Sequence, residues 1–425
     1  MRHSRDKLIG APSLSLSLSL SLALSNLVNR SLVRGTDQMN YDAIVLGTGG
    51  IGSAATYQLA QRGARVLGLD RYPAAHDQGS SHGQTRIIRL AYFEHPDYVP
   101  LLRRAFTLWH DLEQRSDTTL YDPVGLLQAG PSDGEVVSGV LQSSELHQLD
   151  VERLSAREIE RCFSGFQVPE HFVGVFERQA GYLHVEAAVA QHLRLAQRLG
   201  ATLQFGEQIV EWRREGQQIR VTTDRNHYLT ERLIVTAGPW AASLLRSLPV
   251  PLTILRKHLH WYEPTDQRYE ARNGGCTFLF ELPDGIYYGF PQLTGDRDGV
   301  KIAEHSGGVA IADPQLDSRL IDAEDRRRVE SFIKRCLPGV TPRHQRHAVC
   351  YYTMSPDGHF LVDRDPQDEA VFFVAGLSGH GFKFASVLGE VLAQMAIDGQ
   401  TDQPIDFLSL RRFDKTSVTE RATGE

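Results

Sequence analysis

The chain has few cysteines and no long apolar run, and both absences narrow the classes of protein it can belong to. Its four cysteines form no C-x-x-C pair, so no disulfide framework and no metal site are predicted, and a reducing, cytoplasmic setting is expected. No stretch of about 20 apolar residues is present, so no membrane-spanning helix is predicted. Blocks of Lys and Arg are also missing and the net charge is −7, which argues against nucleic acid as a partner.

What the sequence does contain is ample material for a hydrophobic core. Hydrophobic residues make up 41% of the 425 residues, which gives room for two domains or for one large discontinuous domain. The Ser, His and Asp residues show no G-x-S-x-G nucleophile elbow, so a hydrolase is not supported.

Residues 1–38 differ in composition from the rest of the chain. The run Ser13–Ser25 is a nearly perfect alternation of Ser and Leu that follows Arg2, Arg5 and Lys7, which is compatible with a secretory signal peptide. Half of this run is serine, however, and no small-x-small cleavage site follows it. Because a repeated CT dinucleotide encodes Leu-Ser in every reading frame, we favour a mis-assigned start or a disordered extension, with the folded protein beginning at Met39. N-terminal sequencing of the native protein tests this hypothesis.

The most informative segment runs from Tyr41 to Asp70. An apolar stretch leads into Gly47-Thr-Gly-Gly-Ile-Gly52, a run with helical periodicity follows as far as Arg62, and a second apolar stretch ends in an acid. A strand, a glycine-rich turn, a helix and a second strand with a terminal carboxylate are typical of the dinucleotide-binding βαβ unit.

Each residue type in this unit has a mechanical reason. Gly47 permits the tight turn, Gly49 lets the backbone approach a pyrophosphate, and Gly52 lets the helix pack close to the strand. Asp70 lies 18 residues after Gly52 and can accept hydrogen bonds from ribose hydroxyls. Thr56 departs from the pattern, because Gly or Ala is frequent at this position in flavin proteins, and it puts the local packing of the helix in question.

Hydrophobic periodicity predicts the remaining architecture. We expect an α/β fold of mixed character, with a Rossmann-type nucleotide-binding domain built from residues 39–115, 181–249 and 346–413 and a mixed-sheet substrate domain built from residues 116–180 and 250–345. The predicted helices are 97–115, capped by Asp97, and 185–199, 240–248, 324–336 and 382–397. The predicted strands after the first unit are 201–205, 208–212, 218–223, 228–229, 233–237 and 371–375.

Several residues have a chemical interpretation and an ordinary structural one. The glycines of Ser378–Phe384 stand between a strand and a helix, where backbone N–H groups stabilise negative charge such as that on a reduced flavin, but a simple turn explains them equally well. Arg86 and Arg89 suit a substrate carboxylate, although surface ion pairs are the commoner use of such a pair. Taken alone, Lys301 would be a solvated lysine on an alternating strand and Cys350 a buried core thiol.

In this order, the motifs resemble one family, the monomeric sarcosine oxidases and N-methyltryptophan oxidases, which are flavin-dependent oxidases of secondary amino acids. The resemblance extends from Met39 to about Phe413. It is closest to the N-methyltryptophan oxidase branch in residues 255–262 and 378–390. The other motifs that carry it are residues 47–52, 79–89, 285–291, 300–302 and 348–352.

The resemblance implies FAD as the cofactor. Cys350 matches the residue that carries FAD through a thioether to the 8α methyl group of the ring. Arg86 and His82 match residues beside the flavin ring, and Gly379 and Gly381 belong to the turn whose N–H groups face it.

The resemblance also implies roles toward the substrate and oxygen. Arg89 and Lys383 match the pair that binds the substrate carboxylate, and Tyr288 and His305 match groups that line the substrate pocket. Lys301 matches the lysine near flavin N5 that activates oxygen, where its charge would stabilise superoxide.

The chain departs from the family pattern at four positions. Ser81 and Gln84 stand where the common Ser-His-His-Gly-Asp-Thr-Arg motif has its first His and its Asp. Leu90 replaces a His common after the second Arg, and Glu304 stands where a neutral or basic residue is usual. These departures leave the oxidase prediction intact, but they put flavin tuning and substrate choice in question.

The resulting prediction is a monomeric FAD-dependent oxidase that demethylates N-methyl-L-tryptophan and yields L-tryptophan, formaldehyde and hydrogen peroxide. Sarcosine, pipecolate or another secondary amine stays open as the substrate. A flavin dehydrogenase that passes electrons to an acceptor other than oxygen also stays open. A non-catalytic dinucleotide-binding protein is disfavoured, because covalent flavin has little use without redox chemistry.

Overall fold

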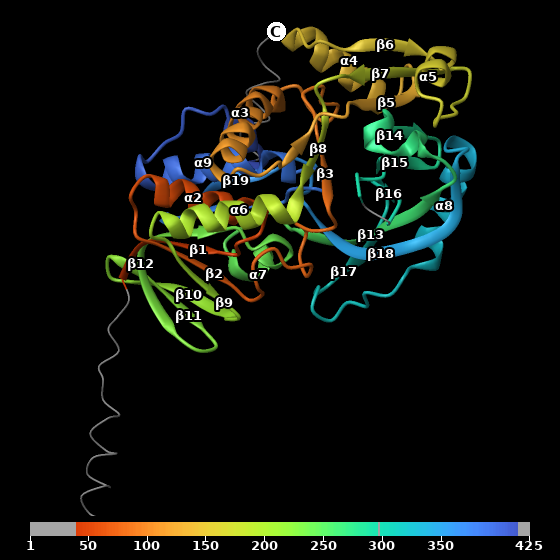
Figure 1. Cartoon of the computed structure of the whole chain (residues 1–425). Helices are drawn as coiled ribbons and strands as arrows, with labels where there is room; N and C mark the ends of the chain where they lie inside the picture. Colours follow the sequence, from red (N-terminus) through yellow and green to blue (C-terminus); the bar gives the residue numbers. More distant parts are fainter. Residues whose placement is uncertain (1–39, 296–297, 415–425) are drawn as a thin grey trace, which may run out of the picture. The chain divides into compact units, whose positions relative to one another are not determined.

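The expected βαβ unit is present in the computed structural model, which describes residues 40–295 and 298–414 (Figure 1). Strand β1 (Asn40–Leu46) and strand β2 (Val66–Asp70) are parallel neighbours, and helix α2 (Gly50–Gln61) connects them. Thr56 is fully buried in this helix and its hydroxyl donates a hydrogen bond to the carbonyl of Gly52, at 2.7 Å, so the helix accommodates it without a break. The extension expected at residues 1–38 lies outside the described residues.

Parallel strands from three distant parts of the chain form the centre of the first sheet. Strand β1 pairs in parallel with β2 on one side and with β12 on the other, and β20 joins β12 in parallel. Among the described residues this sheet has eight strands, with the order β10-β11-β12-β1-β2-β9 and with β20 and β19 continuing from β12. The added strands are β9 (Thr202–Phe205), β10 (Ile209–Glu215), β11 (Gln218–Thr223), β12 (His227–Val235), β19 (Leu361–Asp365) and β20 (Asp368–Ala375).

Helices cover one face of this sheet. Helix α2 packs between α6 (Val185–Arg198) and α9 (Ala385–Ile397), and α3 (Tyr98–Ser116) packs on α6 and α9 (Figure 1). The apolar stripe of α3 is buried as its periodicity predicts, with Trp109 at its centre. The cap expected from Asp97 is wrong, since its backbone is helical and its side chain makes no capping hydrogen bond.

Two other elements differ from their predicted form. The strands expected at 228–229 and 233–237 are one strand, β12, because the chain changes partner from β11 to β1 and β20 rather than ending. The helix expected at 240–248 is a 3-10 turn (Gly238–Trp240) followed by the short helix α7 (Ala241–Leu244). The helix ends early: Leu245 already lies outside the helical region, at φ −106° and ψ 66°, and Pro249 disfavours helical backbone at the residue before it.

The second sheet is largely antiparallel and has nine strands among the described residues. Its order is β17-β13-β16-β15-β14-β5-β7-β6, with β18 paired along β13 and only β14 and β5 in parallel. Helix α8 (Ala323–Cys336) packs on β13, β16 and β18, while α4 (Glu135–His147) and α5 (Ala156–Cys162) pack near β5 and β7. The strands are β5 (Leu126–Pro131), β6 (Glu152–Ser155), β7 (Phe172–Glu177), β13 (Thr253–Pro264), β14 (Thr277–Leu282), β15 (Gly285–Phe290), β16 (Val300–Glu304), β17 (Val309–Ile311) and β18 (Val340–Met354).

A small third sheet completes the architecture. It joins β3 (Thr85–Ile88), β8 (Gly181–His184) and β4 (Tyr121–Asp122), all antiparallel. The predicted α/β fold of mixed character is therefore confirmed. The chain from Asn40 onward clusters as one compact unit, and its division into a nucleotide-binding and a substrate domain stays a prediction. Among residues 40–295 and 298–414, no helix combines the length and apolarity that a bilayer crossing requires.

Candidate active site

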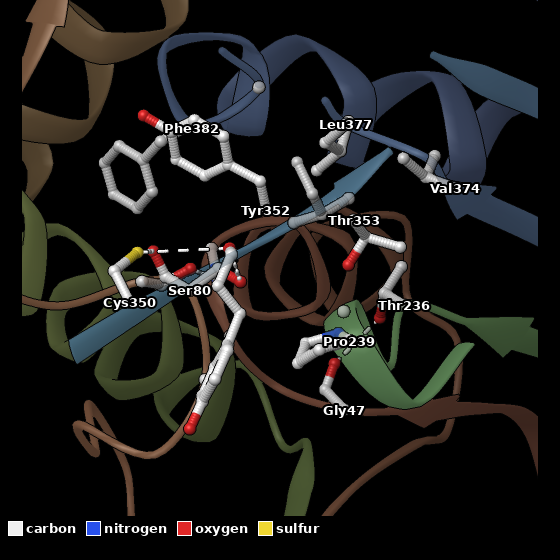
Figure 2. Close-up of a pocket in the computed structure, with 18 of the residues that line it drawn as sticks. Gly47, Ser80, Thr236, Pro239, Cys350, Tyr352, Thr353, Val374, Leu377 and Phe382 are labelled. Carbon is white, nitrogen blue, oxygen red and sulfur yellow. Dashed lines mark hydrogen bonds between the residues drawn. The ribbon is translucent and has the colours of Figure 1, made fainter. Parts of the chain in front are cut away.

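One cavity of about 240 Å³ extends from the glycine turn before α2 to strands of the second sheet (Figure 2). In this view Gly47 and Thr236, which directly follow β1 and β12 of the first sheet, lie at one end, and Cys350 and Ser80 lie at the other. Most residues singled out from the sequence line this cavity, namely Gly47, Gly49, Asp70, Arg86, Arg89, Tyr288, His305, Cys350, Gly379, Gly381 and Lys383. Both sheets therefore contribute to one site.

The glycine turn requires its glycines for two different reasons. Gly47 has a φ of +86°, and a Cβ on Gly52 would lie 1.8 Å from the carbonyl oxygen of Gly47 and 2.5 Å from Oγ1 of Thr236. Gly52 is thus required by the turn itself and by the end of β12. A Cβ on Gly49 would meet only Oγ of Ser81, at 3.6 Å, and this position opens on the cavity. That open face is where a phosphate group has access to the N-terminus of α2.

Asp70 stands at the end of β2 and lines the same end of the cavity. Its carboxylate accepts hydrogen bonds from the N–H of Thr48, at 2.7 Å, and from the N–H of Tyr72, at 3.0 Å. The ring of His76 is 3.6 Å away, and burial lowers the pKa of this histidine. The carboxylate therefore braces the turn at this end of the cavity.

Cys350 lies on β18, 2% exposed, with a cation beside its sulfur. Nη2 of Arg86 is 3.3 Å from Sγ, and the carbonyl oxygen of Ser80 is 3.6 Å from it. The guanidinium is held in place because it also donates to the carbonyls of Thr85, at 2.9 Å, and Ser80, at 3.0 Å. This part of the cavity consequently presents a fixed positive charge next to a thiol.

Arg89 and Lys383 come together as expected, on the ring of Tyr92. The guanidinium carbon of Arg89 lies 4.6 Å and the ammonium of Lys383 5.1 Å from the ring centroid. The ammonium donates to the carbonyl of His380, at 2.8 Å. Burial, followed by the charge of Arg89, lowers the pKa of Lys383 to about 7.

Arg89 forms an ion pair with Glu94, a residue that the sequence did not single out. Its Nη2 donates to Glu94 at 2.7 and 2.5 Å, and its Nη1 donates to Oε1 of Gln128 at 2.6 Å, while Nε has no partner. Glu94 lines the cavity. The only sequence signal for this residue is its spacing of five from Arg89, which does not by itself distinguish an ion pair from a solvated acid.

Tyr288 and His305 form an aromatic corner of the cavity together with Tyr352. The rings of Tyr288 and His305 lie 6.3 Å apart, and Nδ1 of His305 is 3.3 Å from the hydroxyl of Tyr352. Burial lowers the pKa of His305 to about 3, so its ring is neutral at physiological pH. Tyr352 was not predicted, although its position two residues after Cys350 on one strand places both on the same face.

Three of the predicted site residues do not line the described cavity: Gly52, His82 and Lys301. His82 is buried, its Nε2 has no partner, and burial lowers its pKa to about 3. Lys301 donates to the carbonyls of Gly83, at 2.6 Å, and Thr85, at 2.8 Å. Burial, followed by the charge of Arg86, holds the pKa of Lys301 well below its usual value. The solvated lysine expected from the alternating pattern alone is wrong, because every residue of β16 is buried.

Two departures from the family pattern have defined partners. Oγ of Ser81 accepts the N–H of Gly50 in the first turn of α2, at 3.0 Å. Oε1 of Gln84 accepts the indole N–H of Trp261, at 2.8 Å. Both side chains therefore fasten the loop before β3 to its surroundings.

The residues present fit FAD. The glycine turn opens on the cavity at the N-terminus of α2, Asp70 supplies a carboxylate at the end of the second strand, and Cys350 supplies a thiol inside the same cavity. Among the described residues, no cluster of His, Cys, Asp or Glu could hold a metal ion.

Comparison with known proteins agrees with this arrangement. The family model for FAD dependent oxidoreductases matches residues 42–395. The chain is 37% identical to the monomeric sarcosine oxidase of Streptomyces avermitilis over 376 residues, which covers 88% of this chain and 98% of the relative. It is 39% identical to the N-methyl-L-tryptophan oxidase of Yersinia pestis (strain Pestoides F) over 379 residues, which covers 88% of this chain and all of the relative.

Solved structures show the same fold. The open form of NikD, an unusual amino acid oxidase essential for nikkomycin biosynthesis, superposes with a TM-score of 0.77 at 25% identity, covering 87% of this chain and 97% of that chain. L-proline dehydrogenase from P. horikoshii superposes with a TM-score of 0.73 at 19% identity, covering 89% of this chain and 99% of that chain. The matched span, the identities and the cavity lead to one conclusion: the chain belongs to the FAD-dependent oxidoreductases and, within them, to the flavin amine oxidases that include the monomeric sarcosine oxidases and N-methyl-L-tryptophan oxidases.

Proposed function

We propose that this protein is an FAD-dependent oxidase that demethylates N-methyl amino acids, with N-methyl-L-tryptophan as the preferred substrate. The reaction consumes the N-methyl amino acid, oxygen and water, and yields the primary amino acid, formaldehyde and hydrogen peroxide. The observation that carries the proposal is the continuity of one cavity from the glycine turn, past Cys350, to the buried cations Arg89 and Lys383. The choice of substrate rests on likeness to the N-methyl-L-tryptophan oxidases in residues 255–262 and 378–390.

FAD, when bound, supplies a two-electron acceptor for the oxidation of the amine. Gly47, Gly49 and Gly52 would shape the turn that holds its pyrophosphate, and Asp70 its ribose. Cys350 would hold it through a thioether at the 8α methyl group. The fixed guanidinium of Arg86, 3.3 Å from Sγ, supports a flavin site here because it would place a positive charge beside a ring that is negatively charged when reduced.

Arg89 and Lys383 would bind the substrate carboxylate and so orient the amine. The Nε of Arg89 is buried and without a partner, which leaves a donor ready for a carboxylate oxygen. Glu94 occupies Nη2 of the same guanidinium, so a substrate carboxylate would compete with it for that edge. Positioning of this kind offsets part of the entropic barrier to reaction.

The neutral ring of His305 and the hydroxyls of Tyr288 and Tyr352 would line the space for the substrate side chain. Lys301 would supply the positive charge that activates oxygen. Its ammonium donates to backbone carbonyls, which accept the hydrogen bonds without adding a negative charge. Arg86, His82, Gly379 and Gly381 would surround the flavin ring. We further propose that the protein acts as a monomer in the cytoplasm, which its four free cysteines suit.

Acid precipitation of the purified protein tests the tether. We expect a yellow pellet from the wild type and a colourless one from Cys350→Ser. Cys162→Ser, at an exposed cysteine, is the matched control and should stay yellow. A colourless wild-type pellet from protein purified with flavin available would contradict the tether.

Oxidation rates test the substrate and the acceptor. N-methyl-L-tryptophan, sarcosine and pipecolate are compared at equal concentration in air, and hydrogen peroxide is measured. We expect peroxide in proportion to the amine oxidised and the highest kcat/KM with N-methyl-L-tryptophan. A preference for sarcosine would overturn the choice of substrate, and oxidation without peroxide would favour a dehydrogenase.

A further inference from the structure

The segment that carries Arg89 is fastened to the second sheet by two fully buried polar residues, Gln128 of β5 and Glu177 of β7. Both the oxygen and the nitrogen of the Gln128 amide form a hydrogen bond. Its Oε1 accepts from Nη1 of Arg89 at 2.6 Å, and its Nε2 donates to the carbonyl of Ala91 at 3.2 Å. One side chain thereby holds both the guanidinium and the backbone two residues further on.

Glu177 holds the same segment through its backbone. Its carboxylate accepts the N–H of Leu90 at 2.8 Å and the N–H of Ala91 at 2.9 Å. Strands β5 and β7 are antiparallel neighbours in this sheet, so Gln128 and Glu177 act from adjacent strands. Leu90, one of the departures from the family pattern, therefore contributes its N–H to this attachment.

The contact with Gln128 also decides which edge of the guanidinium is left for carboxylates. Nη1 points to Gln128, whereas Nη2 and Nε form the edge that carries Glu94 and the unpartnered donor. A carboxylate binds best across two parallel N–H donors of one edge. By taking Nη1, Gln128 leaves the Nη2–Nε edge as the one that a substrate carboxylate would share with Glu94.

The chemistry of the amide matters as much as its position. A carboxylate at residue 128 would place a second negative charge on Arg89 beside that of Glu94, and an apolar side chain would leave Nη1 buried without an acceptor. An amide oxygen accepts the hydrogen bond without adding a second carboxylate to the one that Glu94 already places beside Arg89.

We infer that Gln128 is a positioning residue for Arg89, one that sets the affinity of the site for the carboxylate of the substrate. This inference rests on the proposed function, in which Arg89 binds that carboxylate. Gln128 does not line the cavity and acts only through the guanidinium.

Gln128→Met, close in size and without an acceptor, and Gln128→Glu, which keeps an acceptor but adds a charge, test the inference in the FAD-loaded enzyme. We expect KM for the amino acid to rise about tenfold in Gln128→Met, with kcat changed by less than about twofold. The Kd of acetate, followed by the absorbance of the bound flavin, should rise by the same factor. Gln128→Glu should weaken acetate binding at least as much, although it restores the hydrogen bond.

The charge-bearing variant separates positioning from mere structural support, since a residue needed only for folding would be rescued by any acceptor of similar size. Gln197→Leu, at an exposed glutamine of α6, is the control and should leave KM and acetate affinity unchanged. If Gln128→Met does not fold, the acetate affinity of Gln128→Glu still decides. Unchanged KM and acetate affinity in the folded variants would overturn the inference and leave the oxidase proposal standing. If the wild type oxidises no N-methyl amino acid but the Gln128 variants bind acetate more weakly than it does, the inference is supported and the proposed function is contradicted.

Discussion

Three lysines are buried among residues 40–295 and 298–414, Lys257, Lys301 and Lys383, and each donates to backbone carbonyls. No ion pair with a carboxylate within 4 Å is formed by any of the three in that part of the chain. Burial lowers the pKa of all of them, to about 8 for Lys257 and about 7 for Lys383. Carbonyl dipoles solvate the ammonium without cancelling its charge. Of the three, Lys383 lines the described cavity, so it remains available to anions that enter there.

Acetate binding should depend on pH through Lys383. Its ammonium is charged below its pKa of about 7 and neutral above it, so acetate affinity should fall as the pH rises through this range. Acetate itself stays ionised throughout. The measurement is the Kd of acetate from flavin absorbance between about pH 6 and about pH 9. Lys383→Met should bind acetate weakly and without this step, and a pH-independent Kd in the wild type would contradict the assignment.

Lys301 should matter for oxygen and not for the amine. We expect Lys301→Met to slow the reoxidation of reduced enzyme by roughly 100- to 1,000-fold, the usual loss when one preorganised electrostatic group is removed. Reduction by the substrate under anaerobic conditions should change little. Stopped-flow absorbance of the flavin measures both half-reactions. Lys334→Met, at an exposed lysine of α8, is the control, and equal reoxidation rates in the two variants would refute the role.

At the scale of elements, the strand pair β13 and β18 separates two unlike surfaces. Lys257 and Cys350 form a cross-strand pair on the cavity side. The alternate residues face α8 and form a row of imidazoles with one acid: Nδ1 of His258 lies 2.9 Å from Nε2 of His347, and Nε2 of His260 lies 2.9 Å from Oδ1 of Asp325. Strand β18, which carries Cys350, thus has titratable side chains on the face opposite the cavity.

This histidine row should make the protein less stable in mild acid. Burial lowers the pKa of His258 and lowers those of His344 and His347 to about 4, whereas an unfolded histidine titrates near 6.5. Between these values the unfolded chain binds more protons than the folded one, so stability is full above about pH 6.5 and falls as the pH drops toward 4.

Urea unfolding midpoints across this range measure the effect. His347→Gln should lose less stability on acidification than the wild type, because one group that favours the unfolded state at low pH is removed. His171→Gln, at an exposed histidine, is the matched control. Parallel pH profiles for His347→Gln and the wild type would show that the row does not drive the acid sensitivity.

The same elements show where sequence patterns predict structure well. The unit from β1 to β2 follows from its glycines and its apolar runs, because all of its determinants are local. The burial of Lys301 could not be predicted this way: alternation on β16 suggests one solvated face, yet both faces are covered by segments distant in sequence. The part of the site that depends on Glu94 and Gln128 was also missed. Gln128 lies 39 residues from Arg89 and no sequence pattern relates the two, and Glu94 lies in a loop without periodicity. Cys350 was found by resemblance to a family, because no spacing rule relates it to the glycine turn.

At the scale of the whole described region, one ligand would touch both large sheets, and its binding should be visible in unfolding. Without the tether, FAD would be held by mass action. The Tm of Cys350→Ser should then rise with added FAD, because each tenfold increase in free FAD adds about 1.4 kcal/mol to the free energy of unfolding. The wild type, already carrying its flavin, should show no such dependence. Differential scanning fluorimetry measures this, with Cys162→Ser as control. Equal FAD dependence in the wild type and Cys350→Ser would contradict the tether.

Strand β1 lies between β2 and β12 in the first sheet. Strand β2 follows β1 directly in the chain, whereas β20, which pairs with β12, comes from near residue 370. A fragment that ends after the second sheet's last helix, α8, would therefore lack β18, β19, β20 and α9, and would expose the edge of β12 and the apolar side of α2. Such a fragment has no reason to fold as a separate nucleotide-binding module. Attempts to transplant, split or circularly permute this enzyme should accordingly keep β20 and α9 together with the strands of the first sheet. During synthesis, the ribosome must add β20 and α9 before the flavin cavity can close.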